Sequence, residues 1–539
     1  MPSKGSEMNV ATTFDNSLKV YGKYNVLYFE GKWYTNAELK EMADRLGNGL
    51  KALGVLPGDR VATQMPNSIQ IIVTIHAVLK IGAVIVPMNP MLRPDQISYI
   101  YRDSGAKVTV TTSDYLPWVK EAQQNAPKLV NIVLTDKDNV PGTICFSELL
   151  EGSSPDLKLE EMDSDDLATL IYTSGTTGNP KGVMHTHNSM WMSVMCRFMQ
   201  AFTYNSISLS STQKIKIPAQ YRESEETYSV TGLNRSAITL AILPLSHVYG
   251  LSFLSLINFM GGTYCMLKRW NIQETLKMIQ DLHVNMLTLV PTMYVQLLDS
   301  PDIDNYDLSS LRGCISGSAP LDPELGRRWK EKIGLDLLEG WGMSESFAGG
   351  VSNSSEHPPR YGSIGSLVLI GHQVKIFGTD DKELPVGQTG EIVMRGPSVM
   401  KGYWNLPEET NLTLKNGWLH SGDLGYMDED GYFYVTDRKK DLIIRGGENV
   451  SPREVEEVIN KHPGVLESCC IGIKDRVYGE EIKAFVVLNK DAACSEADII
   501  GFCNKYLPTF KTPKQVQFIA ALPKNLLGKI LRAELRKIS

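Results

Sequence analysis

The sequence predicts a large α/β body with largely parallel sheets, followed by a small α+β domain. Short apolar segments that suit buried strands alternate with segments whose apolar residues recur at helical spacing, a pattern typical of parallel sheets. With 539 residues the chain exceeds one ordinary domain, and its pattern changes after about residue 437.

The first half of the chain shows the alternation most clearly. Helices are expected at residues 37–53, 69–81 and 95–104, each followed by a glycine, and strands at 60–64, 83–87, 107–111 and 167–172. Later, Leu276, Ile279 and Leu282 line one face of another helix, and residues 286–290 form a buried strand that ends at Pro291. We therefore expect several subdomains, with a second sheet of the same type as the first.

The last part of the chain has its own helix start signal. Ser451, Pro452 and Glu454 suit the N-cap, first turn and third position of a helix. Further strands are expected at 466–473 and 482–488, and a further helix at 499–506. Together they make a domain of roughly 100 residues. The charged segment 437–441 is then interpreted as a linker.

Composition argues against several function classes. The net charge is −7 and no basic run is present, which disfavours nucleic acid as the main partner. No apolar run approaches membrane-spanning length, and residues 1–13 lack the apolar core of a signal peptide. The eight cysteines include no C-x-x-C pair, so reduced thiols in a cytoplasmic protein are expected. The polar stretch 205–234 is expected to be an exposed insertion.

One glycine- and hydroxyl-rich stretch, residues 172–182, directly continues the predicted strand 167–172. Glycines let successive backbone N–H groups turn toward one anion, and a lysine adds a point charge. The stretch contains Thr173, Ser174, Gly175, Thr176, Thr177, Gly178 and Lys181. We expect a polyphosphate ligand, with a flexible surface loop as the alternative. A P-loop is excluded for this stretch. Gly175 and Gly178 stand too close together, and Gly182 rather than Ser or Thr follows Lys181.

The stretch YTSGTTGNPKGVMHTH (172–187) resembles the signature of the adenylate-forming (ANL) superfamily, which includes acyl-CoA synthetases, luciferases and peptide-synthetase adenylation domains. Further blocks resemble the family in the same order: LPLSHVYG (243–250), SGSAP (316–320), EGWGMSES (339–346), GWLHSGDLG (417–425), YVTDRKKDLIIRGGENVSPREVEE (434–457) and PKNLLGKILR (523–532). The resemblance covers nearly the whole chain. It implies an acetyl-CoA synthetase-like fold with a large N-terminal body and a small, mobile C-terminal domain.

The reaction that the resemblance implies has two halves. A carboxylate and ATP give an acyl-adenylate and pyrophosphate, and the acyl group then passes to coenzyme A with release of AMP. ATP, Mg²⁺ and coenzyme A are thus the implied cofactors and substrates, together with a small-molecule carboxylic acid. The implied enzyme class is an acid–thiol ligase, an AMP-forming acyl-CoA synthetase or fatty acid–CoA ligase.

By the same resemblance, the catalytic residues are expected to be Lys529, Lys181, Glu345 and His247. Lys529 bridges the carboxylate and the α-phosphate during adenylation, and Lys181 faces the β- and γ-phosphates. Glu345 and Thr176 are the expected Mg²⁺ ligands. Solvated side chains are the alternative for Lys529 and Glu345.

The remaining nucleotide contacts are also implied by position within the matching blocks. Asp423 accepts both ribose hydroxyls, with a turn-capping aspartate as the alternative, and Arg438 makes a second ribose contact. Trp341 lies where the family has a tyrosine against adenine; its ring can stack, but it has no phenolic hydroxyl. The other expected cofactor-binding residues are Gly317, Ser318, Ala319, Glu339, Gly340, Gly342, Met343, Ser344, Lys440, Gly446 and Gly447.

The acyl site is expected around the block 243–250. His247 is expected next to the reacting carboxylate, with a packed, hydrogen-bonded core histidine as the alternative. No aspartate stands beside it to pair with an ammonium group, which disfavours amino-acid substrates. Small and apolar walls suit a medium- or long-chain fatty acid or a related alicyclic or aromatic acid. The wall candidates are Val248, Tyr249, Gly250, Ser316, Gly340 and Gly349.

Lys440 occupies the position of the family's hinge, so we expect domains at 1–437 and 441–539 with a hinge at 438–440. The small domain is implied to swing about this hinge between the half-reactions, which removes Lys529 and presents a second face. Arg445 and the glycines after it would line the pantetheine path on that face.

Two other interpretations stay open from the sequence. One is an adenylate-forming enzyme that hands its acyl group to a carrier protein or oxidises it as luciferases do. The other is a catalytically silent nucleotide-binding homologue, which the intact set Lys181, Glu345, Asp423 and Lys529 disfavours. The sequence also leaves open whether the chain forms a homodimer.

Overall fold

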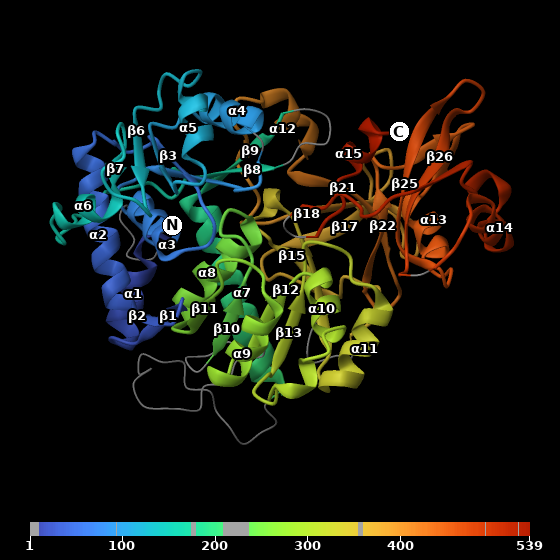
Figure 1. Cartoon of the computed structure of the whole chain (residues 1–539), viewed down its shortest axis with the longest axis horizontal. Coiled ribbons are helices and arrows are strands. Elements are labelled where there is room, and N and C mark those ends of the chain that lie inside the picture. Colours follow the sequence, from blue (N-terminus) through green and yellow to red (C-terminus); the bar gives the residue numbers. More distant parts are fainter. Residues whose placement is uncertain are drawn as a thin grey trace. The chain divides into compact units, whose positions relative to one another are not determined.

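The computed structural model describes residues 10–92, 94–173, 179–208, 237–353, 359–490, 492–525 and 528–539 (Figure 1). The chain forms two compact units. Unit 1 comprises Met1–Gln373 and Arg395–Leu419, and unit 2 comprises Val374–Met394 and His420–Ser539. The predicted polar stretch 205–234 lies outside the described residues, apart from 205–208 at the end of a helix.

Within unit 1, the described residues form an eight-stranded sheet in the order β19-β9-β8-β4-β3-β5-β6-β7. Its strands are β3 (Arg60–Gln64), β4 (Val84–Met88), β5 (Val108–Thr111), β6 (Asn131–Leu134), β7 (Ile144–Cys145), β8 (Leu167–Thr173), β9 (Lys181–Thr186) and β19 (Gly402–Tyr403). The strands from β8 to β7 pair in parallel, whereas β9 pairs antiparallel with β8 and β19. The four strands predicted from the first part of the sequence are confirmed.

A second sheet of unit 1 has the order β16-β15-β14-β13-β12-β10-β11-β1-β2 among the described residues. Its strands are β1 (Asn25–Phe29), β2 (Lys32–Thr35), β10 (Ile238–Ala241), β11 (Thr263–Met266), β12 (Met286–Leu289), β13 (Gly313–Ser316), β14 (Leu337–Gly342), β15 (Gly350–Ser352) and β16 (Leu367–Val368). The strands from β14 to β1 pair in parallel. The expected second, largely parallel sheet is therefore present.

Helices pack beside both sheets of unit 1; Figure 1 shows α9, α10 and α11 beside the green and yellow strands of the second sheet. The helices are α1 (Thr13–Tyr21), α2 (Asn36–Ala52), α3 (Ile69–Lys80), α4 (Pro94–Ser104), α5 (Leu116–Gln123), α6 (Phe146–Glu151), α7 (His187–Ser208), α8 (Val248–Met260), α9 (Ile272–Asp281), α10 (Pro291–Leu298), α11 (Pro323–Ile333) and α12 (Pro407–Thr413). All residues of α3 except Gln70 are buried, as expected for a helix that is apolar on every face.

Unit 2 is built on two sheets. In the first, β17 (Gln373–Phe377), β18 (Gly390–Arg395) and β21 (Trp418–Met427) are neighbours in that order, and β22 (Phe433–Arg438) pairs antiparallel with β21. The short strand β20 (Leu414–Lys415) pairs with the first two residues of β21, which belong to unit 1.

The second sheet of unit 2 has the order β24-β23-β26-β25, with β27 beside β26. Its strands are β23 (Ile443–Arg445), β24 (Glu448–Val450), β25 (Val465–Asp475), β26 (Gly479–Leu488) and β27 (Gln515–Phe518). β25 and β26 extend beyond the predicted 466–473 and 482–488, because their hydrogen-bonded ladder continues to the Asp475↔Gly479 pair after the apolar run ends.

The helices of unit 2 are α13 (Pro452–Ile459), α14 (Glu496–Tyr506) and α15 (Arg532–Lys537). The predicted start of α13 is confirmed, because the Ser451 hydroxyl accepts a hydrogen bond from the Glu454 N–H at 3.2 Å. At the end of the chain, Arg532 donates to both oxygens of Glu456 at 2.7 and 3.0 Å. This pair fixes the C-terminal segment to α13.

All eight cysteines carry free thiols, including the adjacent Cys469 and Cys470, which are both buried. Burial raises the pKa of Cys469 to about 12, so this thiol stays protonated at neutral pH. In the part of the chain that the structure describes, no helix combines the length and apolar character needed to cross a membrane.

Candidate active site

Three of the matching sequence blocks meet at one edge of the second sheet of unit 1. The strands β10, β12, β13 and β14 are parallel neighbours, so the segments that follow them leave from the same edge. These segments contain residues 243–250, 316–320 and 339–346, and Ser316 pairs with Glu339 across the sheet. Ligands of parallel α/β sheets bind at the carboxyl ends of the strands. The topology therefore places a candidate site at this edge.

The buried carboxylate of Glu339 holds two of these segments together. Glu339 lies on β14 and accepts a hydrogen bond from the backbone N–H of Leu321 at 3.0 Å. Leu321 follows the turn that contains Gly317, Ser318 and Ala319, where Ser318 adopts a positive φ of 70°. This hydrogen bond positions the turn 317–319 beside Glu339, and both belong to the expected cofactor-binding residues.

Trp341, with Gly340 and Gly342 on either side, lies at the end of β14, which pairs antiparallel with β15. Two glycines make this close approach possible. A Cβ on Gly350 would lie 2.1 Å from the Trp341 carbonyl oxygen, and one on Gly342 would lie 2.6 Å from that of Ala348. The backbone around Trp341, the residue expected to stack on adenine, is therefore tightly packed.

Glu345 lies on a single 3-10 turn, η3 (Ser344–Ser346), directly after Met343. The Tyr403 hydroxyl donates to its Oε1 at 2.7 Å. The preceding carbonyl, that of Ser344, accepts from Nε2 of the buried His185 on β9 at 2.7 Å. Burial lowers the pKa of His185 to about 4, so the ring is neutral and Nε2 carries the hydrogen of this bond. Strands of the eight-stranded sheet thus hold Glu345 in place.

Lys181 begins β9, opposite Thr173 on β8. Its ammonium donates to Glu409 on α12 at 2.5 Å and lies 5.3 Å from the centre of the Tyr403 ring. Lys181, Tyr403 and Glu345 therefore form one chain of contacts within unit 1. The predicted donors Ser174, Gly175, Thr176, Thr177 and Gly178 lie outside the described residues.

Sequence reasoning missed Tyr403. It lies on β19, whose pairing with β9 joins residues more than two hundred positions apart: Tyr403 pairs with Val183. Burial and the neighbouring Glu345 raise the pKa of Tyr403 well above its usual value, so the hydroxyl remains a donor. No local pattern around Tyr403 indicates this role, because the role depends on that long-range pairing.

His247 is the N-cap of α8. Its Nδ1 accepts a hydrogen bond from the Tyr249 N–H at 3.2 Å, in agreement with the alternative of a hydrogen-bonded histidine. Val248, Tyr249 and Gly250 form the first turn of this helix. A Cβ on Gly250 would lie 2.4 Å from the carbonyl oxygen of Pro244, so only glycine permits this tight entry into the helix.

The turn 316–320, which begins with the predicted wall residue Ser316, lies against this turn of α8. A Cβ on Gly317 would lie 3.0 Å from the Tyr249 ring, so the blocks 243–250 and 316–320 pack directly against each other. Ser316 is fully buried at the end of β13. A Cβ on Gly349 would lie 2.7 Å from the Ser398 hydroxyl, whereas Gly340 has room for one.

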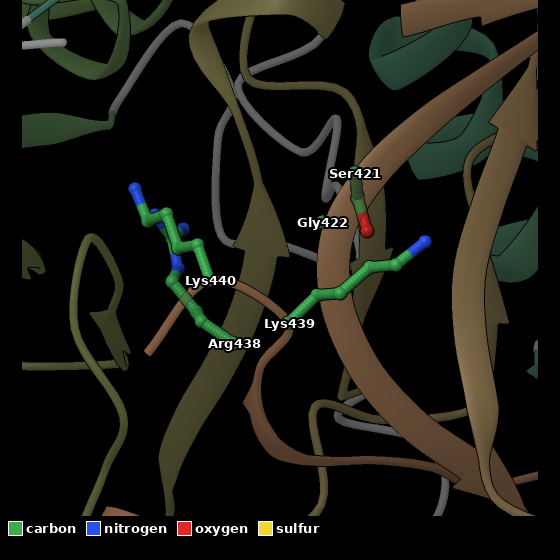
Figure 2. Close-up of a pocket in the computed structure, with 5 residues that line it drawn as sticks. All are labelled: Ser421, Gly422, Arg438, Lys439 and Lys440. Carbon is green, nitrogen blue, oxygen red and sulfur yellow. The ribbon is translucent and has the colours of Figure 1, made fainter. Parts of the chain in front are cut away.

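Unit 2 carries the predicted ribose contacts. Asp423 on β21 and Arg438 on β22 are register partners, and Arg438 Nε lies 2.7 Å from Asp423 Oδ1. Beside them lies a pocket that is lined by Ser421, Gly422, Arg438, Lys439 and Lys440. Figure 2 shows Arg438 and Lys440 extending to one side of the pocket and Lys439 to the other. Three cationic side chains around one pocket favour an anionic ligand.

Lys529 lies within reach of the charges of this same group. It belongs to a C-terminal hairpin in which the Asn525 N–H donates to the Lys529 carbonyl at 2.9 Å. Lys529 is an exposed residue, yet desolvation by the surrounding protein and then the charges of Arg438 and Lys440 lower its pKa to about 8, against the opposing effect of Asp423. The structure thus brings residues of three separate sequence blocks together within unit 2.

The segment after β22 contains the predicted residues of the second face. Gly446 and Gly447 have φ values of 62° and 91°, and they form the tight turn between β23 and β24. Arg445 donates to both oxygens of the buried Glu481, at 2.7 and 2.9 Å, and lies over the Tyr478 ring. The turn is therefore held on a rigid, ion-paired strand.

The donor set around Glu345 suits a metal ion that takes most of its ligands from a nucleotide. In the described residues, no cluster of three or more His, Cys, Asp or Glu side chains stands ready to hold a metal. Mg²⁺ is commonly bound by one or two carboxylates together with water and substrate phosphates. Glu345, with one oxygen oriented by Tyr403, fits that mode of binding.

The chain matches two family patterns: the AMP-binding enzyme pattern over residues 14–404 and the AMP-binding enzyme C-terminal domain pattern over residues 454–529. The chain belongs to the AMP-binding enzyme family. It is 34% identical to a long-chain-fatty-acid–CoA ligase of Bacillus subtilis (strain 168), over 94% of this chain and 90% of that protein. It is also 34% identical to a feruloyl-CoA synthase of Amycolatopsis sp, over 94% of each chain.

Solved structures agree with this assignment. The structure of ATP-bound MatB from Rhodopseudomonas palustris has a TM-score of 0.85 and 30% identity, and the match covers 98% of this chain and 99% of that one. The predicted superfamily, fold class and enzyme class, an AMP-forming acid–thiol ligase, are confirmed. This interpretation is also supported over carrier-protein loading and over a silent homologue. ATP and coenzyme A are supported as substrates of this AMP-binding enzyme.

Replacing Tyr403 by Phe removes the hydrogen bond to Glu345 and keeps the ring that lies near Lys181. A hydrogen bond to a charged group contributes about 1.5–3 kcal/mol, so we expect adenylation to slow about tenfold or more. We also expect the Mg²⁺ concentration for half-maximal pyrophosphate release to rise. Tyr361→Phe is the matched control, because Tyr361 donates to Asp336 at 2.9 Å elsewhere in unit 1. Equal effects of the two substitutions would contradict the assignment.

The lowered pKa of Lys529 predicts a pH dependence. A lysine with a pKa of about 8 loses its positive charge as pH rises through that value, earlier than an ordinary lysine. If the charge is needed for adenylation, kcat/KM for ATP should fall above this pH, since that ratio reports groups of the free enzyme. Lys529→Arg should abolish the alkaline fall, because arginine stays charged. A wild-type profile that stays flat through this range, or a fall that persists in Lys529→Arg, would exclude Lys529 as its source.

Proposed function

We propose that the protein is an acyl-CoA ligase for a medium- or long-chain fatty acid or a related alicyclic or aromatic acid. The main support is the chain of contacts from Lys181 through Tyr403 to Glu345. These contacts fix the position of a cation relative to a carboxylate at the edge of a parallel sheet. The names of the relatives, a long-chain-fatty-acid–CoA ligase and a feruloyl-CoA synthase, support the range of acids.

In the proposed first half-reaction the substrate carboxylate attacks the α-phosphorus of ATP, and the bond to pyrophosphate breaks. Negative charge shifts among several oxygens during this step, so fixed positive charges lower the barrier. Lys181 binds the β- and γ-phosphates in place of its present partner Glu409. Lys529 stabilises the charge shared by the carboxylate and the α-phosphate.

Glu345 would hold Mg²⁺, with Thr176 as a second ligand, and the ion would supply charge neutralisation of the phosphates. The Tyr403 hydroxyl orients the carboxylate for this role, since it occupies one lone pair of Oε1. Trp341 stacks on the adenine, and Asp423 accepts the ribose hydroxyls beside Arg438.

In the proposed second half-reaction the thiol of coenzyme A attacks the acyl carbon, and AMP leaves. The hinge at 438–440 would reorient the segment 441–539 between the two steps. Hydrogen bonds from the N–H groups of Asp441 and Leu442 to the Arg438 carbonyl, at 2.9 and 3.2 Å, make residues 438–441 a turn.

His247 and the small residues around it would surround the reacting carboxylate. The Nδ1 of His247 accepts a hydrogen bond from the Tyr249 N–H, which fixes the orientation of the ring. Among the wall candidates, Gly340 leaves room for a further methyl group, which suits an acyl chain. We also propose a reducing, cytoplasmic location, on the basis of the eight free thiols.

The proposed activity is tested with a panel of straight-chain, alicyclic and aromatic acids, each assayed for coenzyme A-dependent AMP release. We expect at least one fatty or aromatic acid to release AMP only when coenzyme A is present. Glu345→Gln should slow the adenylation of that acid by about 100-fold. Pyrophosphate release without any acceptance of coenzyme A, over the whole panel, would contradict the proposal.

We expect that two different substitutions each block one half-reaction and spare the other. Lys529→Ala should abolish pyrophosphate release but still convert supplied acyl-adenylate and coenzyme A to thioester. Lys440→Pro should make acyl-adenylate once per site and then stall, because proline fixes φ and stiffens the turn. Single-turnover kinetics on each half-reaction measure both effects.

Lys440→Ala is the matched control for the proline variant, since it removes the same side chain and leaves the backbone free. A stall in both Lys440 variants would assign the effect to the ammonium group rather than to the hinge. Equal loss of both half-reactions in folded Lys529→Ala and Lys440→Pro would refute the two-step reorientation.

A further inference from the structure

Arg197 on α7 has a guanidinium that is only partly used. Nη2 donates to the backbone carbonyl of Ala348, whereas Nη1 is buried and has no hydrogen-bond partner among the described residues. One turn earlier on the same helix, the Ser193 hydroxyl donates to the neighbouring carbonyl, that of Phe347, at 3.0 Å. A neutral hydroxyl is thus enough to hold this segment. The hydrogen bond to Ala348 therefore does not by itself explain why this position has a charged side chain.

The charge of Arg197 has no negative partner in the described part of the chain. The groups that influence it are Tyr249 and Cys196, and burial raises the pKa of both, so both are neutral at neutral pH. Burial, and to a smaller degree Arg197 itself, lowers the pKa of nearby His372, which is therefore neutral too. Burial lowers the pKa of Arg197 to about 10, and the guanidinium stays charged at neutral pH.

Tyr249 supplies a second unsatisfied group beside this cation. Its hydroxyl is buried and has no hydrogen-bond partner in the part of the chain that the structure describes. Its ring lies against Gly317, and the Phe253 ring packs edge-on at 5.2 Å. Buried polar groups without partners are uncommon, and an unpaired buried charge costs several kcal/mol. Two such donors, a cation and a hydroxyl that interact electrostatically, favour a ligand group that accepts hydrogen bonds and carries negative charge.

The two donors lie near the ends of neighbouring strands. A Cβ on Gly317, which directly follows β13, would lie 3.1 Å from the Tyr249 hydroxyl. Arg197 contacts Ala348, whose carbonyl oxygen would lie 2.6 Å from a Cβ on Gly342 at the end of β14. A group held by Arg197 and Tyr249 would thus lie beside the first turn of α8, where the acyl site is expected.

We propose that Arg197 and Tyr249 bind a second acidic group of the acyl substrate, remote from the carboxylate that is activated. Nη1 of Arg197 and the Tyr249 hydroxyl each donate a hydrogen bond to this group. The substrate class is then a dicarboxylic acid, of which one carboxylate reacts and the other is held by the guanidinium. This inference rests on the proposed acyl-CoA ligase function and narrows its substrate class.

The test compares alkanoic acids with α,ω-dicarboxylic acids in pairs of equal chain length, from butanoate and butanedioate to dodecanoate and dodecanedioate. The measured quantity is the ratio of kcat/KM for the diacid to that for the monoacid. The wild type should favour the diacid in at least one pair. Arg197→Met should lower that ratio about tenfold or more, since a hydrogen bond to a charged group is lost. Arg197→Lys, which keeps the charge, should retain part of the preference.

Thermal unfolding gives a second readout that does not depend on turnover. The favoured diacid should raise the melting temperature of the wild type and of Arg327→Met, an exposed arginine of α11 that serves as the matched control. It should not raise that of Arg197→Met. A further variant, Tyr249→Phe, should lower the diacid preference and leave the chain folded.

The outcomes distinguish this inference from the function on which it rests. A wild type that favours the monoacid in every pair, or an Arg197→Met variant that loses both acids equally, overturns the second-carboxylate site but leaves the ligase function intact. Coenzyme A-dependent AMP release with none of the acids would instead overturn the proposed function. A diacid-induced stabilisation that persists in Arg197→Met also overturns the inference.

Discussion

The hydrogen bond from Tyr403 to Glu345 joins the two sheets of unit 1 at the candidate site. Tyr403 belongs to the edge strand β19 of the eight-stranded sheet, and Glu345 follows β14 of the nine-stranded sheet. Lys181 lies over the same tyrosine ring. One aromatic side chain therefore fixes the position of a carboxylate relative to a cation, although the two come from different sheets. Strands position side chains more precisely than loops do, and the contacts from Tyr403 on β19 and His185 on β9 hold the short turn that carries Glu345.

The site residues of unit 2 concentrate positive charge. Arg438 is paired with Asp423, yet its charge and that of Lys440 still disfavour the protonated form of Lys529. Like charges held this close are costly until an anion enters between them. Binding of a phosphate-bearing ligand would offset this repulsion, and it would raise the pKa of Lys529 toward the ordinary lysine value. The cluster is thus better suited to a ligand-bound state than to an empty one.

Local signals in the sequence were enough to predict most elements of the fold. The Ser451 cap, the glycines that end helices and the apolar runs of β3, β4 and β5 each act within a few residues, and the structure confirms them. Strand pairing over long distances was not predictable in this way. Val374–Met394 joins unit 2 across the intervening chain, and Tyr403 reaches the site only because β19 pairs with β9. The motif blocks indicated which residues belong to the site, but not which neighbours orient them.

Arg197 illustrates why the acyl end of such a site resists prediction from sequence. An arginine in an apolar helix usually buries its aliphatic stem and keeps its guanidinium in water. Here its Nη1 is buried, and the groups around it are a tyrosine, a cysteine and a histidine that are all neutral. A nucleotide-binding residue can be recognised from its motif because every family member binds the same nucleotide. A residue that selects the acid has no common motif, so it is found only as a charge that the fold itself leaves unpaired.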